Sequence, residues 1–84
     1  MRARQLEVFR TIMQCGTLTE AARILNASQP ALSQVLLNTE DVLGFKLFER
    51  VKDRLVPTPE AEELYPEADR IFGELENLRR TALS

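Results

Sequence analysis

The residues best suited to chemistry lie in one short polar segment, residues 28–34 of the chain. If Leu32 and Leu36 face inward on a helix, the outward positions are Gln29, Pro30, Ser33, Gln34 and Leu37. Amide groups can pair with adenine edges, hydroxyl groups with phosphates, and an apolar ring with a thymine methyl group. This combination suits contact with a DNA groove, but a polar, well-capped helix start would show the same residue types.

Catalytic and metal-binding residues are poorly represented in the chain. The sequence contains no histidine, a single cysteine at position 15 and no glycine-rich phosphate loop. The acidic residues that follow residue 58 are typical of a solvated helix, with acids toward its start and arginines toward its end. We therefore predict that the protein is not an enzyme and has no catalytic residue, metal site or cofactor. We expect Cys15 to be a buried structural residue, since no second cysteine could resolve a disulfide.

Two short helices must position the polar segment. A helix is predicted over residues 5–15, where apolar side chains recur at helical spacing and Gly16 can take the left-handed conformation that ends a helix. The next helix begins after Thr17, which opens a capping-box sequence with Glu20, and ends near Asn26.

The third helix follows after only three residues. Ser28 is suited to its N-cap, Pro30 lies in its first turn, and Gly44 supplies its stop. Two helices joined by such a short turn are typical of the helix-turn-helix motif.

A small β-hairpin is predicted after the third helix. Apolar residues on either side of the charged turn 52–54 suggest two short strands, and Pro57 ends the second. The hairpin carries three cations, Arg50, Lys52 and Arg54. A helix-turn-helix followed by a hairpin is a winged helix in outline.

A long helix is predicted from Pro59 onward, with Thr58 as its cap. Its apolar residues repeat with alternating spacings of three and four, which indicates a heptad seam that pairs with another helix. A helix from Pro59 to Arg80 would be about 33 Å long, close to one DNA turn of about 34 Å. The predicted dimerisation residues are Ala61, Leu64, Ala68, Ile71, Phe72, Leu75 and Leu78.

Length and charge limit the fold and its partners. The chain has 84 residues, 44% of them hydrophobic and 29% charged, which indicates one small soluble domain whose modest core favours dimerisation. The net charge of −2 divides into +2 over residues 1–54 and −4 over residues 55–84. The acidity of the C-terminal part therefore does not exclude binding of nucleic acid by the N-terminal part. We expect a cytoplasmic protein without a membrane partner, since no apolar run approaches the length of a membrane span or a signal peptide.

The whole chain resembles the DNA-binding domain of the LysR-type bacterial transcriptional regulators. The residues that carry the resemblance are Arg4-Gln5-Leu6, Phe9, Gly16-Thr17-Leu18-Thr19-Glu20-Ala21-Ala22, Ser28-Gln29-Pro30-Ala31-Leu32-Ser33, Glu40, Leu43-Gly44, Leu47-Phe48-Glu49-Arg50 and Pro57-Thr58-Pro59-Glu60-Ala61. The hairpin and the start of the long helix look most like members that control amino-acid or opine metabolism.

The resemblance implies a mainly α fold: a winged helix-turn-helix over residues 1–58, with a short β-hairpin wing, and a long C-terminal linker helix over residues 59–84. The linker helix would pair antiparallel with that of a second subunit in a homodimer or a higher oligomer. The implied function is sequence-specific binding of double-stranded DNA. Gln29, Pro30 and Ser33 would contact base edges or nearby phosphates, Thr17 and Ser28 would contact phosphates, and Arg50, Lys52 and Arg54 would contact the backbone or the minor groove.

Three residues and the chain length depart from the family pattern. Gln34 stands where the family usually has arginine, and Leu37 where a basic or polar residue is common, so nonspecific affinity for DNA is expected to be weak. Thr39 stands where leucine is usual, which predicts a marginally packed third helix and a gain in stability from Thr39→Leu. The C-terminal effector domain of the family is not in this chain, so no small-molecule effector is expected to bind it. The alternative function is an interaction module that pairs with a full-length regulator and has only vestigial DNA binding.

Overall fold

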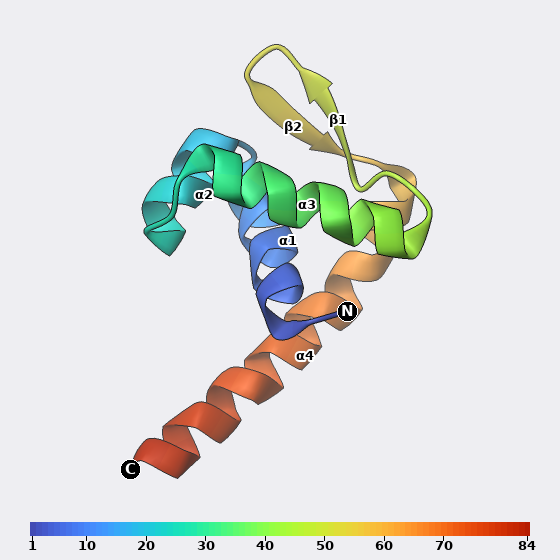
Figure 1. Ribbon diagram of the computed structural model, residues 1–84. Coiled ribbons are helices and arrows are strands. Elements are labelled where there is room, and N and C mark those ends of the chain that lie inside the picture. Colours follow the sequence, from blue (N-terminus) through green and yellow to red (C-terminus); the bar gives the residue numbers. More distant parts are fainter.

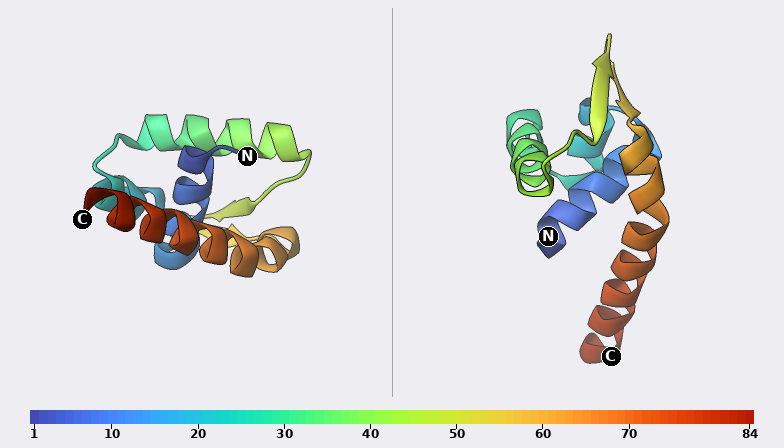
Figure 2. Two further views of the ribbon diagram at one scale, coloured as in Figure 1. Left: turned by 90° about the horizontal axis from the view of Figure 1, so that it is seen from below. Right: turned by 90° about the vertical axis from the view of Figure 1, so that its right-hand side faces the viewer.

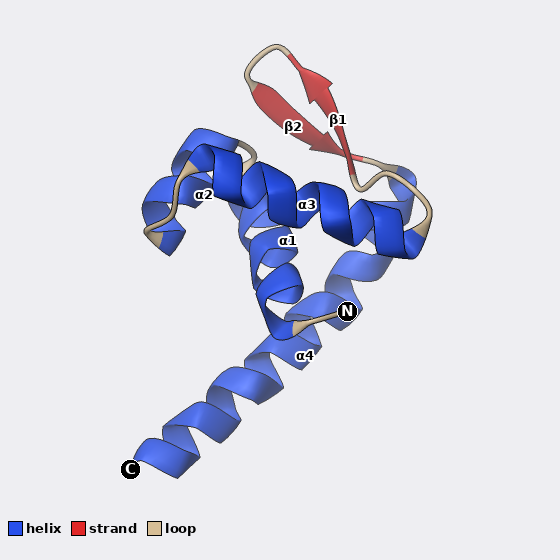
Figure 3. Cartoon of the chain, viewed as in Figure 1, coloured by secondary structure: helices blue, strands red, loops and turns tan.

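The computed structural model describes the whole chain, Met1–Ser84. Its elements, in chain order, are α1 (Ala3–Cys15), α2 (Leu18–Leu25), α3 (Gln29–Leu43), β1 (Phe48–Val51), β2 (Arg54–Pro57) and α4 (Pro59–Leu83). The two strands form one antiparallel hairpin, and every other element is a helix (Figure 3). The order of elements confirms the mainly α winged helix-turn-helix that the sequence predicts.

The ends of the first three helices follow from local side-chain chemistry. Thr17 and Ser28 cap α2 and α3, each accepting a hydrogen bond from the backbone N–H three residues later, at 3.1 and 3.2 Å. Gly16 ends α1 at φ 81° and Asn26 ends α2 at φ 52°, both in the left-handed region that these residues tolerate. The first helix starts at Ala3, two residues earlier than predicted, because the Arg2 N–H donates to Gln5 Oε1 at 2.8 Å.

The α1 helix lies at the centre of the molecule, with α3 on one side and α4 on the other (Figures 1 and 2). Phe9 and Ile12 of α1 are buried against Leu32 of α3 and Leu47 before the hairpin. The rings of Phe9 and Phe48 are 5.9 Å apart between centroids, at a tilt of 49°. A single hydrophobic core therefore joins the helices to the hairpin.

The hairpin, which we call the wing (residues 48–57), is attached to the body at two places. The Glu40 carboxylate of α3 accepts from the backbone N–H of Leu47 at 2.7 Å and of Phe48 at 3.4 Å. The Leu55 N–H donates to the Gly16 carbonyl at 2.9 Å, and the Thr58 N–H to the Leu47 carbonyl at 2.9 Å. The wing is thus held by α3 and by the turn between α1 and α2, and the bond between Thr58 and Leu47 closes its base where α4 begins.

The turn of the wing is shorter than predicted. Val51 pairs with Arg54, so only Lys52 and Asp53 form the loop, and Arg54 belongs to β2 instead of to the turn. Lys52 takes φ 57°, in the left-handed region. The sequence suggested a longer turn because this residue pair is not among those preferred in two-residue hairpin loops.

The α4 helix begins inside the core and then leaves the body (Figure 1). Ala61 and Ala68 are 0% and 7% exposed and belong to the core cluster, and Leu64 is partly buried against it. Within the chain itself, the side chains of Ala61 and Ala68, which the sequence places among the dimer contacts, therefore pack in the core and leave little surface for a partner. Farther along, Ile71 is 45% exposed and Leu78 is 65% exposed. The hydrophobic core crosses the predicted boundary between residues 58 and 59, since Ala61 and Ala68 belong to it.

One contact sets the direction of α4 where it leaves the body. The Arg10 guanidinium of α1 donates to Asp69 Oδ1 at 2.7 Å and lies over the Phe72 ring, 4.7 Å from its centroid. Because Phe72 is occupied by this contact within its own chain, only part of its surface is free for a partner.

Thr39 lies in the core at 2% exposure, and its hydroxyl donates to the Val35 carbonyl at 2.8 Å. Thr39→Leu is expected to raise the unfolding free energy by about 1 kcal/mol through added apolar burial, which corresponds to about 4–8 °C in Tm for a domain of this size. Thermal unfolding followed by circular dichroism measures the change.

The matched control is Thr39→Val, which removes the hydroxyl without adding volume. A higher Tm for Thr39→Val but not for Thr39→Leu would mean that the site has no room for the larger leucine side chain. A lower Tm for the leucine variant would contradict the predicted packing of α3.

Candidate nucleic-acid interface

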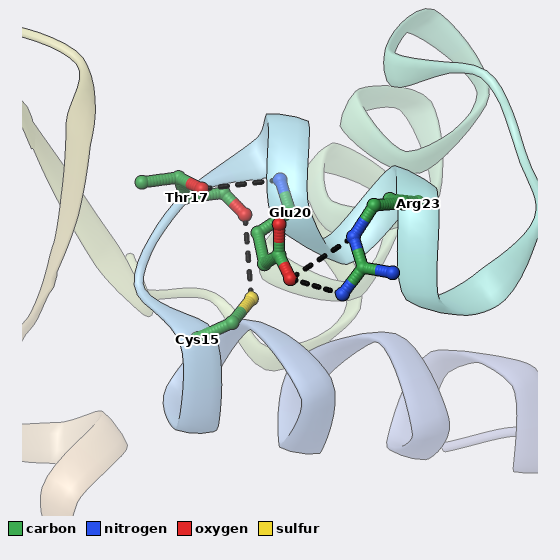
Figure 4. A network of polar contacts seen from close by, with 4 residues as sticks. All are labelled: Cys15, Thr17, Glu20 and Arg23. Carbon is green, nitrogen blue, oxygen red and sulfur yellow. Dashed lines mark hydrogen bonds and ion pairs between the residues drawn. The ribbon is translucent and has the colours of Figure 1, made fainter.

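The turn between α1 and α2 carries a small polar network (Figure 4). Thr17 Oγ1 accepts from the Glu20 N–H, the Cys15 thiol donates to the Thr17 carbonyl at 3.4 Å, and Arg23 donates to the Glu20 carboxylate. That last hydrogen bond holds the pKa of Glu20 below its usual value and raises the pKa of Arg23. Cys15 is half-buried instead of buried, and its thiol has a hydrogen-bond role in this turn.

The outward residues predicted on the third helix all lie on one side of α3, and we call them the α3 surface: Gln29, Pro30, Ser33, Gln34 and Leu37. All are exposed except Ser33, which is half-buried. The Gln29 amide donates to Thr19 Oγ1 at 3.2 Å, and the Gln34 amide to Asn38 Oδ1 at 3.0 Å. Each amide therefore keeps its carbonyl oxygen free while its position on the helix is fixed. Ser28 is exposed at the start of the same helix, where it serves as the cap.

A groove of about 220 Å³ lies between α3 and the wing. Ser33 and Leu37 line it from α3, and Arg50 lines it from β1. Lys46, which the sequence interpretation missed, lies on the same groove and 3.8 Å from Glu49. The sequence feature that could have pointed to Lys46 is a cation between the end of α3 and the start of β1.

The wing cations do not lie on a single face. Pairing of Arg50 with Leu55 and of Val51 with Arg54 places Arg50 and Arg54 on opposite faces of the hairpin. Arg50 borders the groove beside α3, whereas Arg54 lies over the turn before α2, where a Cβ at Gly16 would be 2.9 Å from its Nη2 atom. Lys52 lies at the tip between them. Thr17, next to Gly16, is thus close in the fold to Arg54, and Ser33 to Arg50.

The electrostatic character of this side depends on the wing. None of its three cations, Arg50, Lys52 and Arg54, forms an ion pair within the chain. The α3 helix contains no lysine or arginine, and its only charged residues are Glu40 and Asp41 near its end. A polyanion that approached α3 would therefore meet no cation on α3 itself and three unpaired cations on the neighbouring wing.

The exposed apolar part of α4 lies apart from this surface. The wing and the C-terminal part of α4 project from the body in opposite directions (Figure 2, right). No three His, Cys, Asp or Glu residues gather as a metal would require. None of the helices combines the length and apolar character that a bilayer crossing needs.

Comparison with known proteins places this geometry in a family. Residues 3–62 match the family described as bacterial regulatory helix-turn-helix protein, lysR family. The chain is 50% identical over 82 residues to the HTH-type transcriptional regulator DgcR of a Pseudoalteromonas species, covering 98% of this chain and 28% of that protein. It is 38% identical to the octopine catabolism/uptake operon regulatory protein OccR of Rhizobium meliloti, over 98% and 28% of the two chains. The chain thus spans just over a quarter of these two regulators, and an octopine regulator is among its relatives, as the sequence led us to expect.

A solved structure of a DNA-binding domain has the same fold as this chain. The DNA-binding domain of BenM, in a complex with benA site 1 DNA, superposes on this chain with a TM-score of 0.88 at 29% identity, over 98% of this chain and 92% of that one. The matched region contains both the helix-turn-helix and the wing. The chain therefore belongs to the lysR family of bacterial regulatory helix-turn-helix proteins.

Proposed function

We propose that this protein binds double-stranded DNA in a sequence-specific manner, as the reading domain of a dimeric transcriptional regulator. The observation that carries this proposal is the α3 surface, whose amide, hydroxyl and apolar groups are exposed beside wing cations that have no ion-pair partner. The complex of the similar BenM domain with DNA supports it. No feature of the structure favours the alternative of an interaction module with vestigial DNA binding.

The α3 surface would enter a major groove while the wing cations contact the sugar-phosphate backbone. Gln29 and Gln34 have the groups that pair with adenine in a major groove, and Ser33 can donate to a base or a phosphate. Arg50 and Arg54, on opposite faces of the wing, would contact phosphates at two separate places. Thr17 and Ser28, at the starts of α2 and α3, would contact phosphates there.

We further propose that α4 joins two copies of the chain. Beyond Ala68, Ile71 and Leu78 are 45% and 65% exposed along the helix, and the half-buried Leu75 shares an apolar depression with Ile71, Met1 and Leu6. A helix of 25 residues is about 37 Å long, which suits two reading helices in successive major grooves. The effector, any higher oligomer and action in the cytoplasm belong to the complete regulator and are proposed from the family.

The proposal is tested by selecting duplexes from a random pool with the purified protein and measuring Kd by fluorescence anisotropy at several salt concentrations. We expect enrichment of a two-half-site sequence and a Kd that rises with salt, because phosphate binding releases counterions. A failure to bind any duplex at low salt would refute DNA binding.

Gln29→Ala is expected to relax base preference at one position of each half-site. Loss of a bidentate amide contact to adenine costs about 1–3 kcal/mol of discrimination, so the selected base would lose about five- to 150-fold in preference at that position. Repeating the selection with the variant measures the change.

Arg54→Ala is the contrasting variant, because Arg54 would contact phosphate alone. It is expected to weaken binding to all duplexes alike and to reduce the slope of log Kd against log salt by about one. If Arg54→Ala changed the selected sequence, or Gln29→Ala changed only the salt slope, the assigned roles would be wrong.

Leu78→Glu is expected to weaken the dimer about ten- to hundredfold, since a leucine buried from each subunit is replaced by a charge. The subunit itself should stay folded, because this side chain is 65% exposed. Sedimentation over a range of concentrations measures the change. The control is Leu83→Glu, which makes the same substitution on an exposed leucine outside the seam. Unchanged sedimentation of the Leu78 variant would refute pairing through this part of α4.

A further inference from the structure

Leu37 is an exposed apolar residue on a surface that is otherwise polar. Its side chain is 59% exposed, whereas Leu32 and Leu36, which hold α3 to the core, are buried. It follows Pro30 by seven residues, nearly two full turns, so the two lie almost in line on the same face of the helix. The fold therefore does not need Leu37 for its core and presents it on the α3 surface.

The surroundings of Leu37 identify what could cover it. It lines the groove between α3 and the wing together with Ser33, Lys46, Arg50 and Glu40, and the Glu40 carboxylate accepts hydrogen bonds from the backbone N–H groups of Leu47 and Phe48. Lys46 lies 3.8 Å from Glu49, whereas Arg50 has no acidic partner in the chain. An unpaired arginine at the edge of an apolar contact, with a lysine beside it, suits a polyanion that also presents an apolar group. In a DNA major groove the only such group on a base is the C5-methyl group of thymine. A protein partner would have to bring acidic groups to the same two cations.

Position along the helix separates Leu37 from the other reading residues. Gln29 and Leu37 are eight residues apart, which is about 12 Å along the helix axis. Since base pairs are spaced by about 3.4 Å, the two residues meet different base pairs. The absence of lysine and arginine from α3 also removes the usual partners of guanine from this helix.

We propose that Leu37 is a specificity-determining residue that packs against the C5-methyl group of one thymine in each half-site. The inference rests on the proposed DNA binding and adds to it the class of base that this position selects. Leucine would exclude water from the methyl group, and Lys46 and Arg50 would bind the phosphates that flank the same base.

The test uses the duplex selected from the random pool, with each thymine replaced in turn by deoxyuridine, which lacks only the methyl group. We expect the unmodified protein to bind about fourfold more weakly for each half-site in which one particular thymine is replaced, as burial of one methyl group predicts. Leu37→Ala should bind the thymine and uracil duplexes equally, at the affinity that the unmodified protein has for the uracil duplex.

Val42→Ala is the matched control, since Val42 is an exposed apolar residue of α3 that lies about 140° around the helix from Leu37. This variant should keep the full preference for thymine. The inference is refuted if no single thymine matters, if Leu37→Ala keeps the preference, or if Leu37→Ala changes the sedimentation of the protein instead of its base preference. If no duplex is selected at all, the proposed DNA binding fails first, so the two failures are distinguishable.

Discussion

Phe9→Ala is expected to lower the free energy of unfolding by about 3–5 kcal/mol, the usual cost of emptying a buried phenylalanine site. Phe9 is 1% exposed in the central helix α1, and its ring lies 5.9 Å from that of Phe48 in the wing. A small domain has a total stability of about 5–10 kcal/mol, so this variant is expected to be partly unfolded near 37 °C. Urea unfolding followed by circular dichroism measures the loss.

The control for this prediction is Phe9→Leu, which keeps most of the buried volume and is expected to cost about 1–1.5 kcal/mol. Both variants should show the urea m-value of the unmodified protein, since the surface exposed on unfolding is nearly the same. A loss below about 1 kcal/mol for the alanine variant would mean that Phe9 does not join the helices to the wing.

Glu40→Ala is expected to detach the wing from α3 and to destabilise the fold by about 2–3 kcal/mol. Glu40 Oε2 accepts hydrogen bonds from the backbone N–H groups of Leu47 and Phe48, at 2.7 and 3.4 Å. A hydrogen bond to a charged group contributes about 1.5–3 kcal/mol, and its removal leaves the N–H groups of two buried residues without their acceptor. DNA affinity should also fall, because Arg50 would lose its fixed position beside the α3 surface.

Two variants separate the loss of the anchor from the loss of charge. Asp41→Ala removes the same charge from the next, exposed position of α3, and should leave the unfolding free energy within about 0.5 kcal/mol of the original. Glu40→Gln keeps an acceptor oxygen, so its loss of unfolding free energy should lie between the losses for Glu40→Ala and Asp41→Ala. Equal effects of Glu40→Ala and Asp41→Ala on stability would show that charge alone matters.

The helix ends were predictable because each depends on residues close together in the chain. Thr17, Ser28 and Thr58 each accept a hydrogen bond from the backbone three residues later, and Gly16 provides the left-handed conformation that ends α1. The start of α1 differed, because the hydrogen bond from the Arg2 N–H to the Gln5 side chain extends the helix toward the N-terminus, and α4 continues past Arg80 to Leu83.

The exposure of the predicted dimerisation residues could not be predicted from the heptad pattern, because that pattern does not show which neighbouring element covers an apolar stripe. Ala61 and Ala68 fit the same repeat as Leu78, yet the first two lie in the core of their own chain. Arg10 pairs with Asp69, 59 residues away, and the start of α1 reaches farther along α4, where Leu6 shares an apolar depression with Ile71 and Leu75. No local signal in the sequence reports a contact over that separation.

The wing shows the same limit for the candidate interface. The sequence grouped Arg50 and Arg54 as two cations of one hairpin, and the strand register places them on opposite faces. A turn longer by one residue would have moved one of them to the other face, since side chains alternate along a strand. Glu40, which attaches the wing to α3, carries no spacing signal, because its partners are backbone groups seven and eight residues away.

The sequence by itself determined the six elements and the chemical groups on the α3 surface, because helix caps, turns and apolar periodicity act over three to seven residues. Only the tertiary structure decided which apolar residues of α4 remain exposed, where each wing cation points, and that Leu37 lies uncovered beside Arg50. The physical reason is that burial and orientation depend on neighbours brought together by folding, and these neighbours are distant along the chain.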